Sequence, residues 1–181
     1  MPLPQQKIFT AKDYWNLPED QRAELIDGQL YNMAPPSRLH QELVMELAST
    51  IRNYIKSHHG TCKVYPAPFA VDLNADDQTY VEPDISVICD SKKLTDRGCS
   101  GAPDFIIEIV SPSSRKMDYG KKMWLYMNAG VREYWIVDPS MKRTTLYRFE
   151  DTEAPMIVSF EHPIQMGIYP ELKITIANLL E

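Results

Sequence analysis

The sequence predicts an α+β fold, and three observations support this. A long amphipathic helix precedes a run of short apolar segments that have the length of strands. One strand–helix–strand unit, residues 104–138, returns the chain to the same sheet and so joins two strands in parallel. Helices and strands do not alternate repeatedly, as they would in a doubly wound fold. We expect a single domain over residues 1–181, because this length suffices for one core.

The amino-terminal part contains a helix signal and a hairpin signal. Residues Thr10–Asp13 resemble a capping box with Asp in place of Glu or Gln, so a short helix follows and ends near Pro18. Asp27-Gly28 separates two short apolar runs, which predicts a β-hairpin over residues 24–31.

The strongest helix signal covers residues 37–59, and Gly60 ends it. A single helix of this kind usually lies across a sheet. His40 stands near its start and is a candidate ligand or base, although a lone histidine there is more often a surface or capping residue. The apolar stripe of this helix consists of Leu39, Leu43, Leu47, Ile51, Tyr54 and Ile55.

Strand signals occupy most of the remaining chain. Two strands pair around a polar turn at residues 74–78, and residues 91–102 form a polar connection. Ser113 or Ser114 caps a helix that ends at Gly130. The predicted strands are residues 62–73, 80–88, 104–111, 133–138, 144–149, 156–160 and 172–176.

The net charge of −6 argues mildly against a nucleic-acid partner, but the charge is unevenly distributed. Residues 112–148 carry 8 basic and 3 acidic side chains, whereas residues 149–181 carry 1 basic and 6 acidic. Local charge matters more than total charge for steering a phosphate polymer. The basic block therefore favours a nucleic-acid interface about as much as a solvated helix face.

The cysteines and the amino terminus bear on the compartment. Cys62, Cys89 and Cys99 are odd in number and lack metal-ligand spacing, so we expect free thiols in a reducing compartment. The first ten residues have no signal-peptide run, and no stretch is long enough to span a membrane. We therefore expect a cytoplasmic protein without a membrane partner.

Two acidic residues stand in apolar surroundings. Glu108 lies within the apolar strand of residues 104–111, and Asp84 directly precedes the apolar run of residues 85–88. A buried carboxylate is costly unless it is paired or bound to a metal. If the two strands are neighbours, Asp84, Glu108 and a strand carbonyl such as that of Ile109 would form an open site for Mg²⁺ or Mn²⁺. Such a metal polarises a scissile phosphate and lowers the pKa of a bound water.

A lysine near such a site would position the attacking water and stabilise the developing charge. Asp118, Lys122 and Tyr126 share one helix face that could turn toward the acidic pair. An ordinary helix pair between Asp118 and Lys122 explains the same spacing somewhat more readily. Other chemistries fit less well, because the sequence lacks a glycine-rich phosphate loop, a Gly-x-Ser-x-Gly elbow and zinc-ligand spacing.

Taken together, the motifs resemble the Uma-type restriction endonucleases, a bacterial family of the PD-(D/E)XK nuclease superfamily. The usual lysine two residues after the acidic residue is absent, because Val110 occupies that position. The resemblance implies a migrated lysine at Lys122, which is preferred over Lys121 because it stands four residues before Tyr126. It covers nearly the whole chain and rests on residues 24–28, the helix with His40, and residues 82–87, 103–114, 118–131 and 133–139.

The resemblance also implies a restriction-endonuclease-like fold, in which helices flank a central mixed β-sheet. It implies metal ligands at Asp84 and Glu108, with Ile109 supplying its carbonyl, and catalytic roles for Asp84, Glu108, Lys122 and Glu24. The metal would be Mg²⁺ or Mn²⁺, the substrate DNA, and the assembly a homodimer.

Three hypotheses follow, and we favour the first. The protein is a magnesium-dependent endodeoxyribonuclease, because three residues of the right types occur together. Alternatively, it is a catalytically inactive DNA- or protein-binding domain on a nuclease fold, as the acidic net charge and Val110 suggest. In the third, it is a structural domain whose two acidic residues are satisfied by hydrogen bonds.

Overall fold

The computed structural model describes residues 7–151 and 154–180, and it confirms the predicted α+β class. The helices are α1 (Ala11–Trp15), α2 (Arg38–Ser57) and α3 (Met123–Ala129), with short helical turns η1 (Ser91–Lys93), η2 (Met117–Lys122) and η3 (Ile176–Leu179). The strands are β1 (Ala23–Ile26), β2 (Gln29–Asn32), β3 (Lys63–Pro66), β4 (Val71–Asp72), β5 (Tyr80–Val81), β6 (Ile85–Ile88), β7 (Leu94–Thr95), β8 (Gly98–Ser100), β9 (Phe105–Ile109), β10 (Glu133–Asp138), β11 (Arg143–Arg148), β12 (Met156–Ser159), β13 (Ile164–Gln165) and β14 (Lys173–Ile174).

The central sheet is mixed and has the strand order β12-β11-β10-β9-β6-β3. Strands β9 and β10 pair in parallel, with Glu108 opposite Ile136, as the strand–helix–strand unit predicts. The neighbouring pairs β6–β9 and β10–β11 are antiparallel. The strands that carry Glu108 and follow Asp84 are therefore neighbours.

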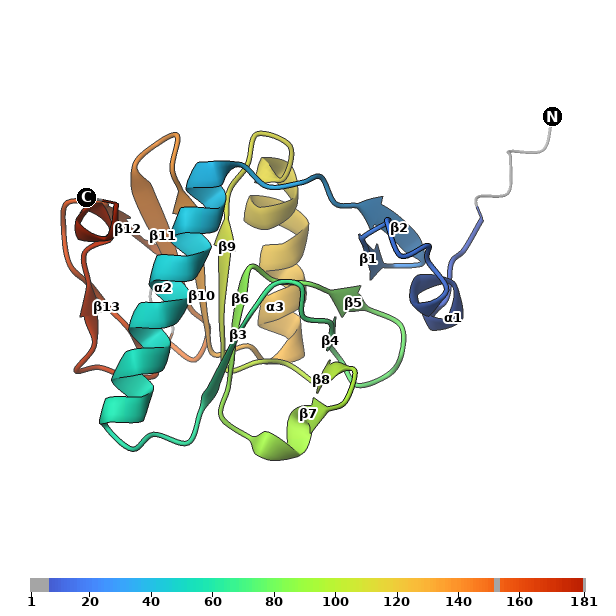
Figure 1. Ribbon diagram of the computed structural model, residues 1–181, viewed down its shortest axis with the longest axis horizontal. Coiled ribbons are helices and arrows are strands. Elements are labelled where there is room, and N and C mark those ends of the chain that lie inside the picture. The colour runs from blue at the N-terminus through green and yellow to red at the C-terminus, as the bar shows by residue number, and fades with distance from the viewer. Residues whose placement is uncertain (1–6, 152–153, 181) are drawn as a thin grey trace.

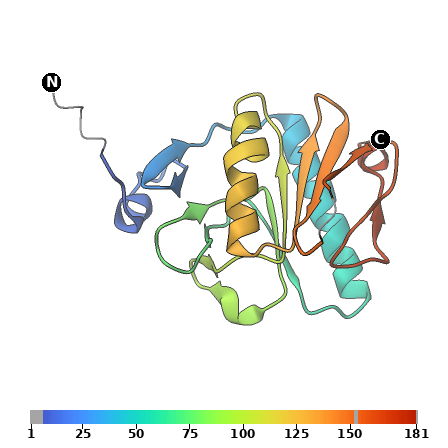
Figure 2. The same ribbon diagram turned by 180° about the vertical axis from the view of Figure 1, so that it is seen from behind.

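Helices cover both faces of this sheet: α2 lies on one face and α3 on the other (Figures 1 and 2). Side chains of a strand alternate between the faces, so Phe105, Ile107 and Ile109 of β9 join the core beneath α2. Ile106 instead joins the core that contains Tyr126 of α3. By the same alternation, Glu108 points toward α3.

A second, smaller sheet has the order β2-β1-β5-β4-β8-β7 and lies beside the central one (Figure 1). The predicted pairing of residues 62–73 with residues 80–88 is present, but each segment is divided into two strands. β3 pairs with β6 in the central sheet, and β4 pairs with β5 in the small sheet. Asp84 lies where the chain passes from β5 of one sheet to β6 of the other.

Most local predictions agree with the structure. Thr10 and Asp13 form the capping box, and Asp27 and Gly28 have positive φ angles in the hairpin turn. The predicted cap by Ser113 or Ser114 is wrong, because η2 begins without a side-chain cap and Ser114 Oγ donates to Asp118 instead. The prediction that residues 91–102 form a polar connection without regular structure is wrong, because this segment contains η1 and the hairpin β7–β8. Sequence periodicity did not reveal these strands because they are only two or three residues long.

The expectation of three free thiols is also wrong. Cys62 and Cys89 form a disulfide, and Cys99 is a buried free thiol. The antiparallel register pairs Lys63 with Ile88, so the residues just outside that pair face each other. None of the helices in residues 7–151 and 154–180 has the length and apolar character of a membrane span.

The N-cap of α2 provides a test of the fold. The Ser37 side chain accepts a hydrogen bond from the backbone N–H of His40 at 3.2 Å. Ser37→Ala should lower the free energy of unfolding by about 1 kcal/mol, measured by urea titration. Ser57→Ala, at the exposed other end of the helix, is the matched control and should change stability less. Equal losses in the two variants would contradict this role of the cap.

Candidate active site

Glu108 is the centre of a buried polar cluster between β9 and the helix that follows it. Its Oε1 accepts hydrogen bonds from the Lys122 ammonium at 2.9 Å and from the Tyr126 hydroxyl at 2.6 Å. Only 4% of Glu108 is exposed, so this carboxylate relies on protein partners rather than bulk water.

Lys122 joins two carboxylates from different parts of the fold. Its Nζ lies 2.9 Å from Glu108 Oε1 and 2.9 Å from Glu24 Oε1, and the side chains of all three residues are buried. Asp118 is farther away, with 4.0 Å between its Oδ1 and Lys122 Nζ. Lys121 points elsewhere: its Nζ contacts Asp27 Oδ2 at 2.9 Å on the β1–β2 hairpin.

A turn of π-helix places these groups. Residues Met117–Lys122 form η2, which continues directly into α3. A π-turn is wider than an α-turn, and such turns occur often at functional sites. Asp118 is fixed by a hydrogen bond from Ser114 Oγ at 2.6 Å and, through its backbone carbonyl, by the Tyr134 hydroxyl at 3.1 Å. Asp118, Lys122 and Tyr126 do share one face.

Asp84 directly precedes β6 and lies beside the end of β9. Its side chain, rather than a backbone carbonyl, accepts a hydrogen bond from β9 there. Its Oδ2 accepts a hydrogen bond from the Ile109 N–H at 2.7 Å. His40 of α2 approaches the same oxygen, with Nε2 at 3.1 Å, while its Nδ1 is buried without a hydrogen-bond partner in the described structure. Burial lowers the pKa of His40, but Asp84 and the Ile109 backbone outweigh it and raise the pKa above its ordinary value.

Glu24 reaches the cluster from the small sheet. Its Oε1 accepts a hydrogen bond from the Glu82 N–H at 2.9 Å, in addition to its ion pair with Lys122. The Glu82 carboxylate is held in turn by Arg22 at 2.6 Å and by the Tyr14 hydroxyl at 3.1 Å. This chain of contacts fixes the small sheet against α3.

The cluster carries more negative than positive charge. Burial raises the pKa of Glu108 well above its ordinary value; Lys122 opposes this rise, and Asp84, Asp118 and Glu24 add to it. Burial likewise raises the pKa of Asp118 to about 6. Burial alone would lower the pKa of Lys122, but the surrounding carboxylates raise it well above its ordinary value. Lys122 is therefore cationic at neutral pH, and its single ammonium is shared among the acidic groups of Glu108, Glu24 and Asp118.

The structure thus brings together the residues that the sequence singled out. Glu24, Glu108 and Lys122 are in direct contact, and the charge of Asp84 acts on Glu108. Within residues 7–151 and 154–180, no group of three or more His, Cys, Asp and Glu side chains is arranged to hold a metal ion. The sequence reasoning assigned no role to Glu82, because its contacts with Arg22 and Tyr14 connect distant segments and leave no local pattern.

The charge balance predicts how Lys122→Met will behave. Removing one partner of a buried ion pair costs roughly 3–5 kcal/mol, and we expect this loss at pH 8 in urea unfolding. Without the ammonium, the pKa values of Glu108 and Asp118 rise further, so the folded state binds more protons than the unfolded chain. The stability of the variant then falls as pH rises, and the loss should be smaller at pH 5.

Lys121→Met is the control for this prediction, because it removes the neighbouring lysine and its half-exposed pair with Asp27. Its loss should stay below about 1 kcal/mol at both pH values. A loss at Lys122 that does not depend on pH would contradict the charge balance described above.

Comparisons with known proteins identify the family of the chain and a solved structure of the same fold. Two curated Synechocystis sp. proteins are similar: uncharacterized protein slr1290, 26% identical over 148 residues (81% of this chain, 76% of that protein), and uncharacterized protein sll1609, 25% identical over 147 residues (78% and 81%). A crystal structure described as a putative nuclease belonging to DUF820, from Anabaena variabilis, superimposes with a TM-score of 0.78 at 22% identity. The superposition covers 94% of this chain and 97% of that chain, which confirms the restriction-endonuclease-like fold. Residues 11–177 match the Uma2 family model, described as "Putative restriction endonuclease", and the chain therefore belongs to this family.

Proposed function

We propose that the protein is an endonuclease that hydrolyses DNA phosphodiester bonds with the help of Mg²⁺ or Mn²⁺. The observation that carries the proposal is the contact of Lys122 with Glu108 beside Asp84, at the adjacent ends of two paired strands. Membership of a nuclease family supports a nucleic-acid substrate. The choice of DNA over RNA and the dependence on metal are parts of the proposal.

The donor groups fit a hard divalent cation. Asp84 and Glu108 supply carboxylate oxygens, and the backbone N–H of Ile109 holds Asp84 at the end of β9. In a strand, N–H and C=O of one residue point to the same side, so the Ile109 carbonyl faces Asp84 as well. Magnesium sites typically use only one or two carboxylates, with waters and substrate phosphate as further ligands. A cluster of three acidic side chains is therefore not required.

Each residue has a distinct task in this proposal. Asp84 and Glu108 would hold the cation, which would polarise the scissile phosphate and lower the pKa of a bound water. Lys122 keeps its proton, so its ammonium stabilises negative charge that develops on the phosphate. Glu24 and Tyr126 position that ammonium and the Glu108 carboxylate. His40 orients Asp84 through Oδ2.

We also propose a homodimer in the cytoplasm. Cutting both strands of a duplex requires two sites, which two copies of this chain would supply. The DNA of a bacterial cell lies in the cytoplasm, and the proposal of this compartment rests on a DNA substrate alone, because the Cys62–Cys89 disulfide removes the argument from free thiols. Each copy would contribute one site from its single restriction-endonuclease-like domain.

A second candidate is an inactive DNA- or protein-binding domain on the same fold, and a specific observation favours its protein-binding form. Five of the eight basic residues in the segment 112–148 are engaged in ion pairs within the protein, which leaves less free positive charge for phosphates than the sequence suggests. These residues are Arg115, Lys121, Lys122, Arg132 and Arg148.

Plasmid cleavage with Mg²⁺ or Mn²⁺ against EDTA tests the proposal. Wild-type protein should nick or cut only with metal. Asp84→Asn removes the charge that binds the cation but keeps an oxygen that can accept from the Ile109 N–H, so it should fold normally and cut at least about 100-fold more slowly. Asp20→Asn, at an exposed position, is the matched control and should cut as wild type does.

An unchanged rate in Asp84→Asn would rule out this residue as a ligand. No cutting by the wild type on plasmid, linear and single-stranded DNA, with either metal, would favour the binding domain. The DNA-binding form of that domain would still retain DNA, with an affinity that falls steeply as salt increases, whereas the protein-binding form would not retain it.

A further inference from the structure

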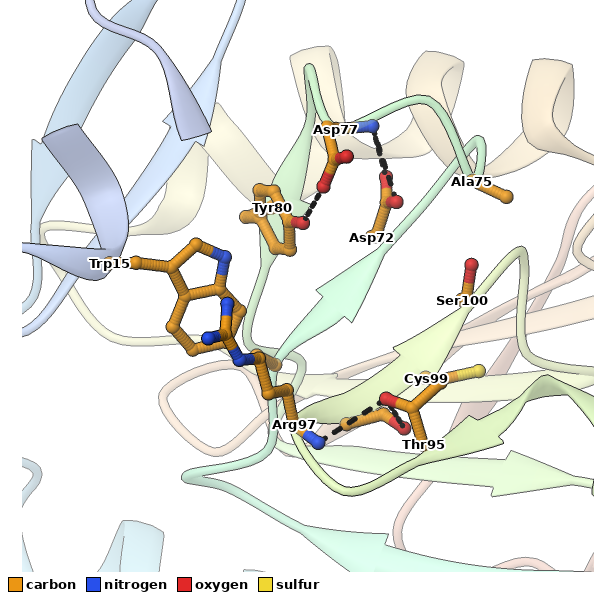
Figure 3. Close-up of a pocket in the computed structure, with 11 residues that line it drawn as sticks. Trp15, Asp72, Ala75, Asp77, Tyr80, Thr95, Arg97, Cys99 and Ser100 are labelled. Atoms are coloured by element: carbon orange, nitrogen blue, oxygen red, sulfur yellow. Dashed lines mark hydrogen bonds between the residues drawn. The ribbon is translucent and has the colours of Figure 1, made fainter. Parts of the chain in front are cut away.

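The small sheet carries a pocket of about 270 Å³ that is separate from the carboxylate cluster and shares no lining residue with it (Figure 3). The pocket is formed by the end of α1, the turn between β4 and β5, and the hairpin β7–β8. Pockets for drug-sized ligands measure roughly 300–1,000 Å³, so this one suits a smaller group. Its side chains include Trp15, Asp72, Asp77, Tyr80, Arg97 and Ser100.

One wall of the pocket consists of planar groups. The Arg97 guanidinium lies 5.2 Å from the centroid of the Trp15 ring, and the Tyr80 ring meets Trp15 edge-on at 5.4 Å (Figure 3). Trp15 and Arg97 are both exposed, whereas Tyr80 is buried. Tyr14 stacks on Tyr80 at 4.8 Å and supports it from within the protein. An indole ring with a guanidinium over it favours a flat, polarisable ligand.

The facing wall carries carboxylates. Both oxygens of Asp72 accept a hydrogen bond from the Asp77 N–H, and Asp77 Oδ1 accepts one from the Tyr80 hydroxyl. Asp72 Oδ1 also accepts from the Asp76 N–H, whereas Asp72 Oδ2 and the Asp77 carboxylate have lone pairs that can accept further donors. Burial raises the pKa of Asp72; hydrogen bonds from the Asp77 and Asp76 N–H groups oppose this rise, and the charges of the same two residues add to it. This wall therefore favours a ligand with N–H groups.

We propose that this pocket binds one unpaired nucleobase of the DNA substrate, and that it prefers a base with an exocyclic amino group. The inference rests on the proposed nuclease function and extends it to a substrate class. The base stacks on the Trp15–Arg97 pair and donates its amino group to Asp77 or Asp72. Cytosine, adenine and guanine each present such a donor, whereas thymine has no amino group and presents a carbonyl oxygen at the position where cytosine carries its amino group.

The pocket is close to the candidate active site. Tyr80 stands four residues before Asp84, so their Cα atoms are at most about 14 Å apart. Contacts continue from Tyr80 through Tyr14 to Glu82, and from Glu82 through Glu24 to Lys122. A strand whose base occupies the pocket would therefore be cut within a few nucleotides of that base.

An unpaired base is required because a paired base cannot reach the pocket. Inside a duplex, both faces of a base are stacked and its amino group is paired. Extrusion costs a few kcal/mol, and the cost is least for bases that are already unpaired. The substrate class that follows is DNA with a bulge, a mismatch or a single-stranded segment.

The test measures binding without cleavage. Fluorescein-labelled duplexes with a single bulged cytosine, a single bulged thymine or no bulge are titrated in EDTA, with fluorescence polarisation as the readout. We expect the cytosine bulge to bind best and the paired duplex to bind worst. Trp15→Ala should weaken binding of the cytosine bulge at least about fivefold, the change that corresponds to about 1 kcal/mol of base stacking.

Three further variants separate stacking, base choice and general affinity. Trp15→Phe keeps a ring and should retain most of the bulge preference. Asp77→Asn suits the positive φ of 59° at this position and should reduce the preference for cytosine over thymine. Trp124→Ala removes the other exposed tryptophan, on α3, and should leave the ratio of bulged to paired binding unchanged.

The outcomes distinguish this inference from the proposed function. Equal binding of bulged and paired DNA, or equal losses in Trp15→Ala and Trp124→Ala, overturns the pocket proposal, even if metal-dependent cutting is found. A bulge preference that depends on Trp15 supports the pocket, even if no cutting is found. If dCMP alone binds with the affinity of the bulged duplex and no DNA shows a preference, the pocket binds free nucleotides and the assignment to a strand is wrong.

Discussion

The position of one buried ammonium constrains the rest of this structure. Lys122 Nζ contacts Glu24 of the small sheet and Glu108 of the central sheet, both at 2.9 Å, and is itself carried by the π-turn before α3. A buried charge must keep its partners, because an unpaired one costs several kcal/mol. The three elements therefore cannot move independently. Because the buried Lys122 must keep its partners, the acidic groups are held in a fixed arrangement beside β9 of the central sheet.

The same arrangement leaves the cluster electrically unbalanced. The pKa values of Glu108 and Asp118 are raised mainly by burial, and neighbouring carboxylates add to the rise. A structural ion-pair network would normally match its charges, whereas this one gathers acidic groups around a single lysine. Perturbed pKa values of this kind concentrate at functional sites. This imbalance is the physical argument for the cation site that we propose, because an ion pair that only packed α3 would not need the additional acidic groups.

Local sequence rules predicted much of this site, and the misses have physical causes. A continuous run of apolar neighbours singled out Glu108, and helical spacing put Asp118, Lys122 and Tyr126 on one face. The contact between Glu24 and Lys122 joins residues nearly a hundred positions apart. Nothing in the local sequence pattern of either segment indicates this contact. The disulfide of Cys62 and Cys89 depends on strand register, which residue counts do not reveal.

The small sheet is the part of the fold that sequence patterns described least well, and it connects the two proposed sites. Strands β4, β5, β7 and β8 are too short to show alternation. In the same sheet, β1 carries Glu24, and β4, β5 and β8 form part of the pocket wall. Glu82 follows β5 directly and bonds through its backbone N–H to Glu24 and through its carboxylate to Tyr14, which stacks on Tyr80. A ligand that orders the pocket would therefore also stabilise the position of Glu24 beside Lys122. Substrate recognition and alignment of the acidic cluster would then share one set of contacts.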